Sequence, residues 1–304
     1  MLRIMSKAFA ALFCLVFFST SVSAQMLEAP MRRGELGHYI VELTVNGEGP
    51  YNFVIDTAAS LTMLSQGFVE ELGLSPVPGA SGMAHGANGN IQLEYFDLET
   101  VGFGNGELED MRTIVQTSGN WPDFKEDIHG VLGVDVIGNY IPAFLQSGDL
   151  FRLVPSDMNV LAHLSGWTQA PLGRGFGGVR FIEVDVNGTS IDALFDTGAS
   201  RSVMNFEGAS AAGYTHGDPR VGPADRPVNG LGGEPMDAVQ VSDATVVWGE
   251  HSASSQLIVF ADLPIFNVFR MDGPAMIAGA TLFQNRDFVV DYQQSVVLFA
   301  PDAE

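Results

Sequence analysis

The sequence predicts an all-β fold made of two lobes, β-barrel-like halves that are related by a pseudo-two-fold axis. Glycine is abundant, at 35 of 304 residues, and charged residues make up only 16%, a composition typical of many short strands and tight turns. The chain also carries one strand-turn-strand pattern twice, with enough residues around each copy to form a lobe. We expect lobes at residues 25–155 and 179–304, joined by a linker at 156–178.

The segment 1–24 is typical of a cleavable signal peptide. Arg3 and Lys7 give a positive start, residues 8–18 are apolar, and small residues end at Ala24. The apolar run is too short to cross a bilayer, and no later segment has the roughly 18 to 20 apolar residues of a membrane span. We expect cleavage after Ala24 and a periplasmic or secreted protein. The single cysteine, Cys14, lies in this segment, so the exported chain forms no disulfide.

Acidic residues dominate the charge of the chain. The sequence has 36 Asp and Glu against 14 Lys and Arg, for a formal net charge of −22. Such a surface repels phosphate backbones and anionic lipids, so we expect no nucleic-acid partner. We attribute the excess of acidic residues to solubility.

An internal repeat organises the rest of the chain. Copy one begins at His38 and copy two at Val179, each with an alternating strand pattern. Each copy then turns at Asn-Gly, residues 46–47 and 187–188, which predicts a β-hairpin because both residue types tolerate positive φ. Each return strand ends in an aspartate, which is Asp56 in copy one and Asp196 in copy two. We attribute the sequon at Asn187 to this turn.

Further landmarks recur in the same order after each aspartate. Copy one continues with a capped short helix after Ser65 that ends near Gly73. Each copy then has a glycine-rich tip, which we expect to end a long hairpin, and further alternating strands. An apolar pair followed by a glycine comes next, and a closing strand completes the copy. The tips are His85–Asn90 and Asn229–Pro235, the strands 94–101, 111–115, 238–248 and 256–260, the glycines Gly133 and Gly279, and the closing strands 149–155 and 295–301. The glycines near the end of the linker follow no strand of a βαβ unit, so they do not predict nucleotide binding.

The repeated aspartates carry the predicted chemistry. A lone aspartate at a strand end is often a turn cap, but two halves related by a two-fold axis would bring Asp56 and Asp196 face to face. Carboxylates about 3 Å apart share one proton and titrate as a unit. Such a pair can draw a proton from water and donate one to a carbonyl oxygen, which predicts amide hydrolysis without a covalent intermediate. Hydroxyl groups of Thr57 and Thr197 could tie the two loops together.

These motifs resemble retropepsin-like and pepsin-like aspartic proteases, in a bacterial single-chain form with two fused retropepsin-type halves. The resemblance rests on Asp-Thr-Gly-Ala-Ser, the preceding Asn-Gly hairpin, the glycine-rich tips and the later apolar-apolar-Gly, and it covers residues 38–301. It implies an aspartic endopeptidase that needs no cofactor or metal, cleaves a peptide or protein substrate, and works as a monomer because the two lobes replace two subunits.

The resemblance also assigns roles to residues of this sequence. It makes Asp56 and Asp196 the catalytic pair. Loop support would come from Thr57, Ala58, Thr197 and Gly198, and flaps at 84–92 and 228–236 would close over the substrate through Gly86, Ala87, Asn88, Gly230, Leu231 and Gly232. Gly133 and Gly279 would pack behind the aspartate loops.

Two positions depart from the family pattern. Ala58 stands where the family has glycine, and its Cβ crowds the loop, most of all if the position needs positive φ. Ala278 replaces a larger aliphatic residue before Gly279, a change that concerns packing. The first departure leaves an alternative open, in which the fold is a pseudoprotease that binds peptides or envelope components. A processing enzyme that cuts one partner or its own precursor is a second alternative.

Other chemistry finds little support in the sequence. The histidines are scattered rather than clustered as zinc ligands, and we expect them to be structural or surface residues. They are His38, His85, His129, His163, His216 and His251. The sequence has no serine in a Gly-x-Ser-x-Gly elbow and no calcium-loop pattern.

Overall fold

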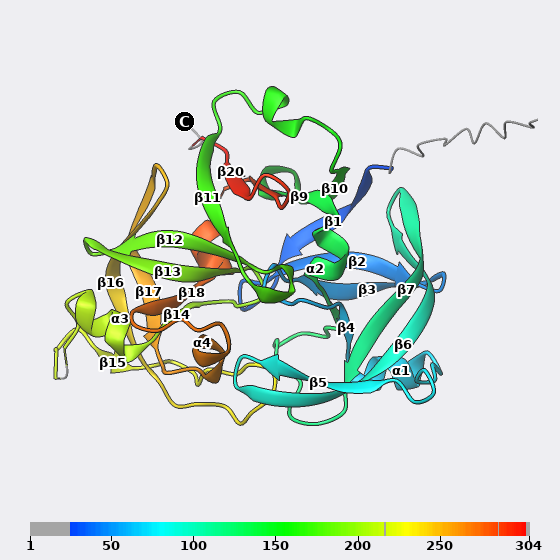
Figure 1. Ribbon diagram of the computed structural model, residues 1–304, viewed down its shortest axis with the longest axis horizontal. Helices are drawn as coiled ribbons and strands as arrows, with labels where there is room; N and C mark the ends of the chain where they lie inside the picture. The colour runs from blue at the N-terminus through cyan, green and yellow to red at the C-terminus, as the bar shows by residue number, and fades with distance from the viewer. Residues whose placement is uncertain (1–24, 216, 285, 302–304) are drawn as a thin grey trace, which may run out of the picture.

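Two lobes of β-structure, one from each copy of the repeat, flank a sheet that both lobes build (Figure 1). The computed structural model describes residues 25–215, 217–284 and 286–301. The predicted signal peptide, with Cys14, and His216 lie outside the described residues. Within the described ranges, no helix has the length and apolar character needed to cross a membrane.

The first lobe is a strongly curved sheet with two short helices. Its β2–β3 hairpin pairs through β2 with β6, and β3 pairs with β8. Its elements are β2 (Tyr39–Val45), β3 (Glu48–Ile55), β4 (Met63–Leu64), α1 (Gln66–Glu71), β5 (Ser81–Gly86), β6 (Gly89–Phe103), β7 (Gly106–Gln116), β8 (Gly130–Leu132) and α2 (Val134–Ile137). The predicted helix cap is confirmed, because Ser65 Oγ accepts the Phe68 N–H at 3.2 Å.

The second lobe repeats this arrangement nearly element for element. The β12–β13 hairpin pairs through β12 with β16, and β13 pairs with β18. Its elements are β12 (Arg180–Val186), β13 (Thr189–Asp196), β14 (Ser202–Met204), α3 (Phe206–Ala211), β15 (Gly222–Pro223), β16 (Val239–Trp248), β17 (His251–Phe260), α4 (Pro264–Val268), β18 (Ala275–Gly279) and η4 (Ala280–Phe283).

A shared sheet joins the lobes in the order β1-β10-β9-β19-β20-β11. The lobes meet where β9 pairs with β19, with Phe144 opposite Phe288. The strands are β1 (Leu27–Arg33), β9 (Tyr140–Leu145), β10 (Leu150–Pro155), β11 (Thr168–Arg174), β19 (Phe288–Asp291) and β20 (Val296–Phe299), with short helices η1 (Gln146–Gly148), η2 (Val160–His163) and η3 (Phe176–Gly178) between them. The stretch predicted as a linker thus contains β11, which pairs with β20 and β12 as β1 pairs with β10 and β2.

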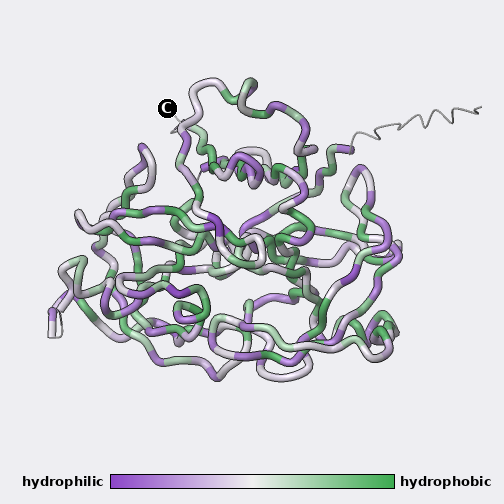
Figure 2. The backbone as a smooth tube through the Cα atoms, in the orientation of Figure 1, coloured by the Kyte–Doolittle hydropathy of each residue, from purple (hydrophilic) through white to green (hydrophobic). Residues whose placement is uncertain are grey.

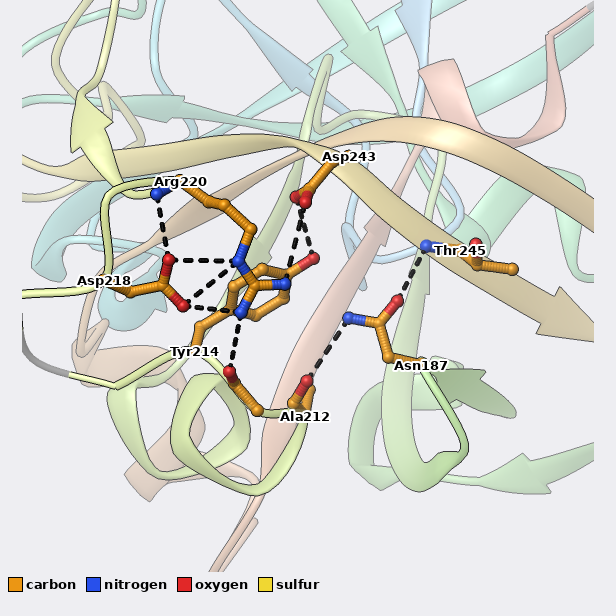
Figure 3. Close-up of polar contacts among 8 residues, drawn as sticks. Asn187, Ala212, Tyr214, Asp218, Arg220, Asp243 and Thr245 are labelled. Carbon is orange, nitrogen blue, oxygen red and sulfur yellow. Dashed lines mark hydrogen bonds and ion pairs between the residues drawn. The ribbon is translucent and has the colours of Figure 1, made fainter.

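The two Asn-Gly turns form as predicted. Asn46 has φ of 51° and Asn187 has φ of 52°, the left-handed conformation of a tight hairpin turn. Asn187 also fixes the turn to its surroundings (Figure 3), because its Oδ1 accepts the Thr245 N–H at 2.9 Å and its Nδ2 donates to Ala212 O at 3.2 Å. Asn46 Oδ1 accepts the Glu99 N–H at 2.8 Å in the same way. These contacts support the turn as the reason for the sequon.

The loop after α3 is tied to β16 beside this turn (Figure 3). Arg220 pairs with Asp218 at 2.5 Å and with Asp243 at 3.6 Å, and its guanidinium lies 4.6 Å from the ring centre of Tyr214. The cluster lies on the outer side of the second lobe and fixes the loop that leads toward β15.

Apolar side chains at alternate strand positions build the interior, and hydrophobic and hydrophilic residues interchange along the strands (Figure 2). In β12, Ile182, Val184 and Val186 are buried while Glu183 is exposed, as expected for strands with one face on the core. Aromatic rings fill the space where the lobes join. Phe144 and Phe288 stack with ring centres 4.3 Å apart.

The strands that end in aspartate pair in parallel with the later glycine strands, an arrangement that the repeat pattern alone did not predict. Ile55 lies opposite Leu132, and Asp196 lies opposite Gly279. This pairing places both aspartate loops at the junction of the lobes, and Phe195, immediately before Asp196, packs in the shared aromatic core at 4.7 Å from Phe283.

Candidate active site

The two aspartates meet at the junction of the lobes. Asp56 directly follows β3 and Asp196 ends β13, and both residues are partly buried. Their carboxyl groups lie close enough that each shifts the pKa of the other. The close approach that the repeat predicted is therefore present in the structure.

Backbone amides hold both carboxyl groups in place. Asp56 Oδ1 accepts the Ala58 N–H at 2.7 Å and the Ala59 N–H at 2.9 Å. Asp196 Oδ1 accepts the Ala199 N–H at 2.8 Å. Hydrogen bonds from N–H groups favour the ionised form of a carboxyl group. They therefore oppose the effect of burial on the two aspartates.

The protonation of the pair is set by burial and by mutual repulsion. Burial raises the pKa of Asp56, against which the amides of Ala58 and Ala59 act. Burial raises the pKa of Asp196 well above its usual range, and the charge of Asp56 adds to this rise. Two close carboxylates cannot both ionise comfortably. The two carboxyl groups therefore share one proton and titrate as a unit.

The two threonines exchange hydrogen bonds across the lobe junction. The Thr57 N–H donates to Thr197 Oγ1 at 3.1 Å, and the Thr197 N–H donates to Thr57 Oγ1 at the same distance. Each hydroxyl then donates to a carbonyl of the other lobe, Thr57 to Phe195 O and Thr197 to Ile55 O, both at 2.7 Å. Both threonines have no exposed surface. The four bonds fix one aspartate loop relative to the other.

The departure at Ala58 is accommodated in the structure. Neither Ala58 nor Gly198 has a positive φ, so the loop does not require glycine for its backbone conformation. Ala58 packs against the apolar cluster of the second lobe that includes Val179, Leu194 and Ile277. Gly198 differs, because a Cβ there would lie 2.1 Å from Asp56 Oδ2. The close approach of the carboxylate thus demands glycine in the second copy, whereas the first copy tolerates alanine.

A hydroxyl six residues after each aspartate supports the loops from behind, and the sequence analysis did not single it out. Thr62 Oγ1 accepts the Gly133 N–H at 3.0 Å and donates to Asp135 Oδ1 at 2.8 Å. Ser202 Oγ accepts the Gly279 N–H at 3.2 Å. Both glycines lie behind the loops. The recurrence of a hydroxyl at the same place in both copies was the signal that could have identified it.

The tips predicted as flaps touch each other. The Asn88 N–H donates to Leu231 O at 2.9 Å, and Asn88 Nδ2 donates to Val228 O at 3.2 Å and to Glu234 O at 3.1 Å. A Cβ on Gly86 would lie 2.2 Å from Leu231 O. Close backbone contact between the lobes therefore explains the glycine at this position.

The predicted flap residues are all in this contact region. They are Gly86, Ala87, Asn88, Gly230, Leu231 and Gly232. The first tip ends the predicted long hairpin, formed by β5 and β6. The second tip was expected to end a long hairpin as well, and it lies between β15 and β16, which pair antiparallel. This hairpin is shorter than the first and interrupted, with the Val228–Met236 bridge beside the tip, and the tip also pairs with the first tip.

The histidines do not gather with acidic residues into a metal site in the described part of the chain. No group of three His, Asp or Glu side chains there could hold an ion. His38 is buried against Phe124, with ring centres 5.1 Å apart, and His129 Nδ1 accepts the Asn52 N–H at 3.3 Å.

Comparisons with known proteins agree with this architecture. The crystal structure of an aspartic proteinase from Irpex lacteus is similar with a TM-score of 0.61 at 13% sequence identity, over 92% of this chain and 98% of that chain. The model of the aspartyl protease family matches residues 41–136 and 182–280, one match in each lobe. A comparison with curated proteins gave no match.

The chain thus has the two-lobed fold of an aspartic proteinase, and the expected all-β two-lobed fold is confirmed. Because the family matches together span more than half of the sequence, the chain belongs to the aspartyl protease family.

Removing one threonine hydroxyl is expected to weaken the junction of the lobes. Thr57→Val leaves Phe195 O and the Thr197 N–H without their partners, and unpaired buried groups should lower the free energy of unfolding by about 2–4 kcal/mol. Thr57→Ser keeps the hydroxyl and serves as the control. Urea denaturation of the three proteins measures the difference, and equal stability of the Val and Ser variants would contradict the assigned role.

His38 is expected to make the fold sensitive to acid. Burial lowers its pKa to about 4, helped by Arg226 and Arg33 and opposed by Glu126. An unfolded histidine binds a proton near pH 6.5, so the unfolded state takes up the proton first as the pH falls. This contribution to stability is complete above about pH 6.5 and is lost toward pH 4, by about 3 kcal/mol.

The contribution of His38 is tested by replacing it with the residue at the equivalent position of copy two. Val179 occupies the place of His38 in copy two, so His38→Val removes the titrating group with a side chain the fold already uses there. Urea denaturation at several pH values should give a shallower loss of stability between pH 6.5 and 4.5 for the variant. Parallel pH profiles for the two proteins would show that His38 does not contribute.

Proposed function

We propose that this protein is an aspartic endopeptidase that hydrolyses peptide bonds with water activated between Asp56 and Asp196. The observation that carries the proposal is the mutual influence of two partly buried carboxyl groups at the lobe junction, each of which has a raised pKa. Such a pair retains one ionised and one protonated member, which are the base and the acid that amide hydrolysis needs. Membership of the aspartyl protease family supports the same activity.

The proposed reaction follows from the protonation of the pair. Asp56, which accepts two amide hydrogen bonds, takes a proton from water as the oxygen attacks the carbonyl carbon. Asp196 gives its proton to the carbonyl oxygen, which yields a gem-diol. Asp56 then gives its proton to the amide nitrogen while Asp196 takes one back from a gem-diol hydroxyl, and the C–N bond breaks to release a carboxylic acid and an amine. No covalent enzyme intermediate forms, and the fixed loops keep both carboxyl groups in position.

The tips give the proposed substrate path. Backbone groups of Gly86, Ala87, Asn88, Gly230, Leu231 and Gly232 would release one another and pair with the main chain of an extended peptide. The hydrogen bonds that join Asn88 to the second tip would have to break for substrate to enter. Peptide binding without cleavage is the alternative function, and it would use the same tips.

Neutralising one aspartate separates these functions. Asp196→Asn and Asp56→Asn are each expected to lower peptidase activity by at least about 100-fold, because the acid or the base is lost. Hydrolysis of denatured casein between pH 3 and 7, with and without pepstatin, measures it. Asp192→Asn, on the exposed side of the same strand β13, is the matched control. Activity of Asp196→Asn at the wild-type level would exclude the mechanism, and wild-type protein that binds peptides without cutting them would establish the binding module.

The pH profile of activity tests the shared proton. The pair is active with one proton, so the rate should fall at acid pH, where both groups are protonated, and again at higher pH, where the last proton leaves. Because the pKa of Asp196 is raised, the second fall should lie above the ordinary range of a carboxyl group. A profile that declines already within that range would contradict the assignment.

The two alanine–glycine positions should respond differently to substitution. Gly198→Ala pushes a Cβ into the Asp56 carboxylate, and a displacement of this kind is expected to cost about 100-fold in kcat/KM. Ala58→Gly removes a Cβ from an apolar contact and should leave kcat/KM close to the wild-type value. The same casein assay measures both. A large gain in activity for Ala58→Gly would instead support an impaired enzyme in the wild type.

We further propose that the chain is exported, loses residues 1–24, and works as a monomer. The two lobes supply both aspartates from one chain, so no second copy is needed to complete the pair. The active species should run as a single chain in size-exclusion chromatography with light scattering, and its N-terminal residue should be Gln25. Activity confined to a dimer would contradict this proposal.

A further inference from the structure

Arg226 lies at the start of the second tip and contacts the loop that follows Asp196. It follows β15 and precedes the bridge at Val228, and its Nη2 donates to Ser200 Oγ at 3.0 Å. Ser200 belongs to the loop that follows Asp196. The guanidinium therefore lies between this loop and the tip at 229–235, which runs toward the β5–β6 hairpin of the first lobe (Figure 1).

The backbone that carries Arg226 is held firmly. Arg201 pairs with Asp225 at 2.5 Å, and its Nη2 donates to Arg226 O and Pro227 O, both at 3.2 Å. Val228 and Met236 exchange two backbone hydrogen bonds at 2.8 and 2.9 Å. A guanidinium on a fixed backbone presents its donors in a defined direction, which lowers the entropy cost of binding a ligand.

The acids around Arg226 are already paired with other cations. Asp225 pairs with Arg201 and Glu126 pairs with Arg32. Asp123 pairs with Lys125. Among the residues that the structure describes, none forms an ion pair with Arg226. Only one of its five N–H donors has a partner in the described structure, so the others can form the two-pronged contact that guanidinium makes with carboxylate.

The charge of Arg226, a residue of the second lobe, acts on residues of the first lobe. It contributes to the lowered pKa of His38, after burial, and to that of Asp123, after Lys125. Both of these residues belong to the first lobe. The cation thus faces the first lobe from the second, in a protein whose formal net charge is −22. A negative field over most of the surface disfavours acidic ligands elsewhere, so Arg226 makes a local exception.

We propose that Arg226 forms a subsite that binds a carboxylate of the peptide substrate near the bond to be cleaved. The proposal rests on the endopeptidase function and names a substrate class for it, peptides with an acidic group at one fixed position. The carboxylate can come from an Asp or Glu side chain or from the C-terminus of a peptide. Arg226 is a specificity-determining residue in this proposal and takes no part in the proton transfers.

The test compares matched peptides of known sequence. A cleavage site found in a denatured protein digest is rebuilt as quenched fluorescent peptides with amidated C-termini, in which each position in turn carries Glu, Gln or Lys. At one position the wild-type enzyme should prefer Glu over Gln by about tenfold or more in kcat/KM. A parallel set, truncated at that position with a free C-terminal carboxylate, shows whether the chain end is the preferred source of the carboxylate.

Two variants connect the preference to Arg226. Arg226→Met should cleave the Gln peptide at a rate near that of the wild type and should lose the preference for Glu. Arg226→Glu should reverse the preference toward Lys. Arg174→Met is the control for the loss of one positive charge, because Arg174 is exposed and donates to Ser295 Oγ and Gln293 O rather than to the second tip. This control should keep the preference for Glu.

The outcomes separate this proposal from the function on which it rests. A wild-type enzyme that cuts peptides but treats Glu and Gln alike at every position, in both peptide sets, overturns the subsite and leaves the endopeptidase intact. A preference that survives in Arg226→Met overturns it as well. Failure of the wild type to cut any peptide overturns the endopeptidase and the subsite together. Retained cleavage of the Gln peptide shows that each variant is folded.

Discussion

The exchange of hydrogen bonds between Thr57 and Thr197 is the interaction on which the site depends. Two carboxyl groups held together repel each other when both are ionised, so the loops that carry them need a restraint from outside the pair. The threonines provide it without adding charge, since each hydroxyl both accepts an N–H and donates to a carbonyl of the opposite lobe. Complete burial protects these four bonds from competition with water.

The symmetry of the fold is broken where the two halves need different chemistry. The loop after the first aspartate carries Ala58, whereas the second copy has Gly198, where a Cβ would meet the Asp56 carboxylate. The tips are unequal too, because only the first ends a long hairpin. The repeat supplies a pair of acids, and the two copies differ in the residues around them.

The backbone arrangement constrains the sequence only at a few places. A fold shared with the Irpex lacteus proteinase at 13% identity shows how little of the chain must be retained to keep the lobes. Glycine is required where neighbouring backbone or a carboxylate leaves no room for a Cβ, as at Gly198 beside Asp56. The sequence as a whole is strongly acidic, with a formal net charge of −22.

The sequence by itself determined the features that arise from local patterns. Asn-Gly turns, alternating strands and the two aspartates are written in neighbouring residues, and their repetition predicted two lobes with facing acids. Tertiary structure decided the rest: the parallel pairing of β3 with β8, the contact of Asn88 with Leu231, and the placement of Arg226 beside Ser200. These contacts join residues far apart in the chain, and their geometry depends on how two folded lobes meet, for which no local pattern exists.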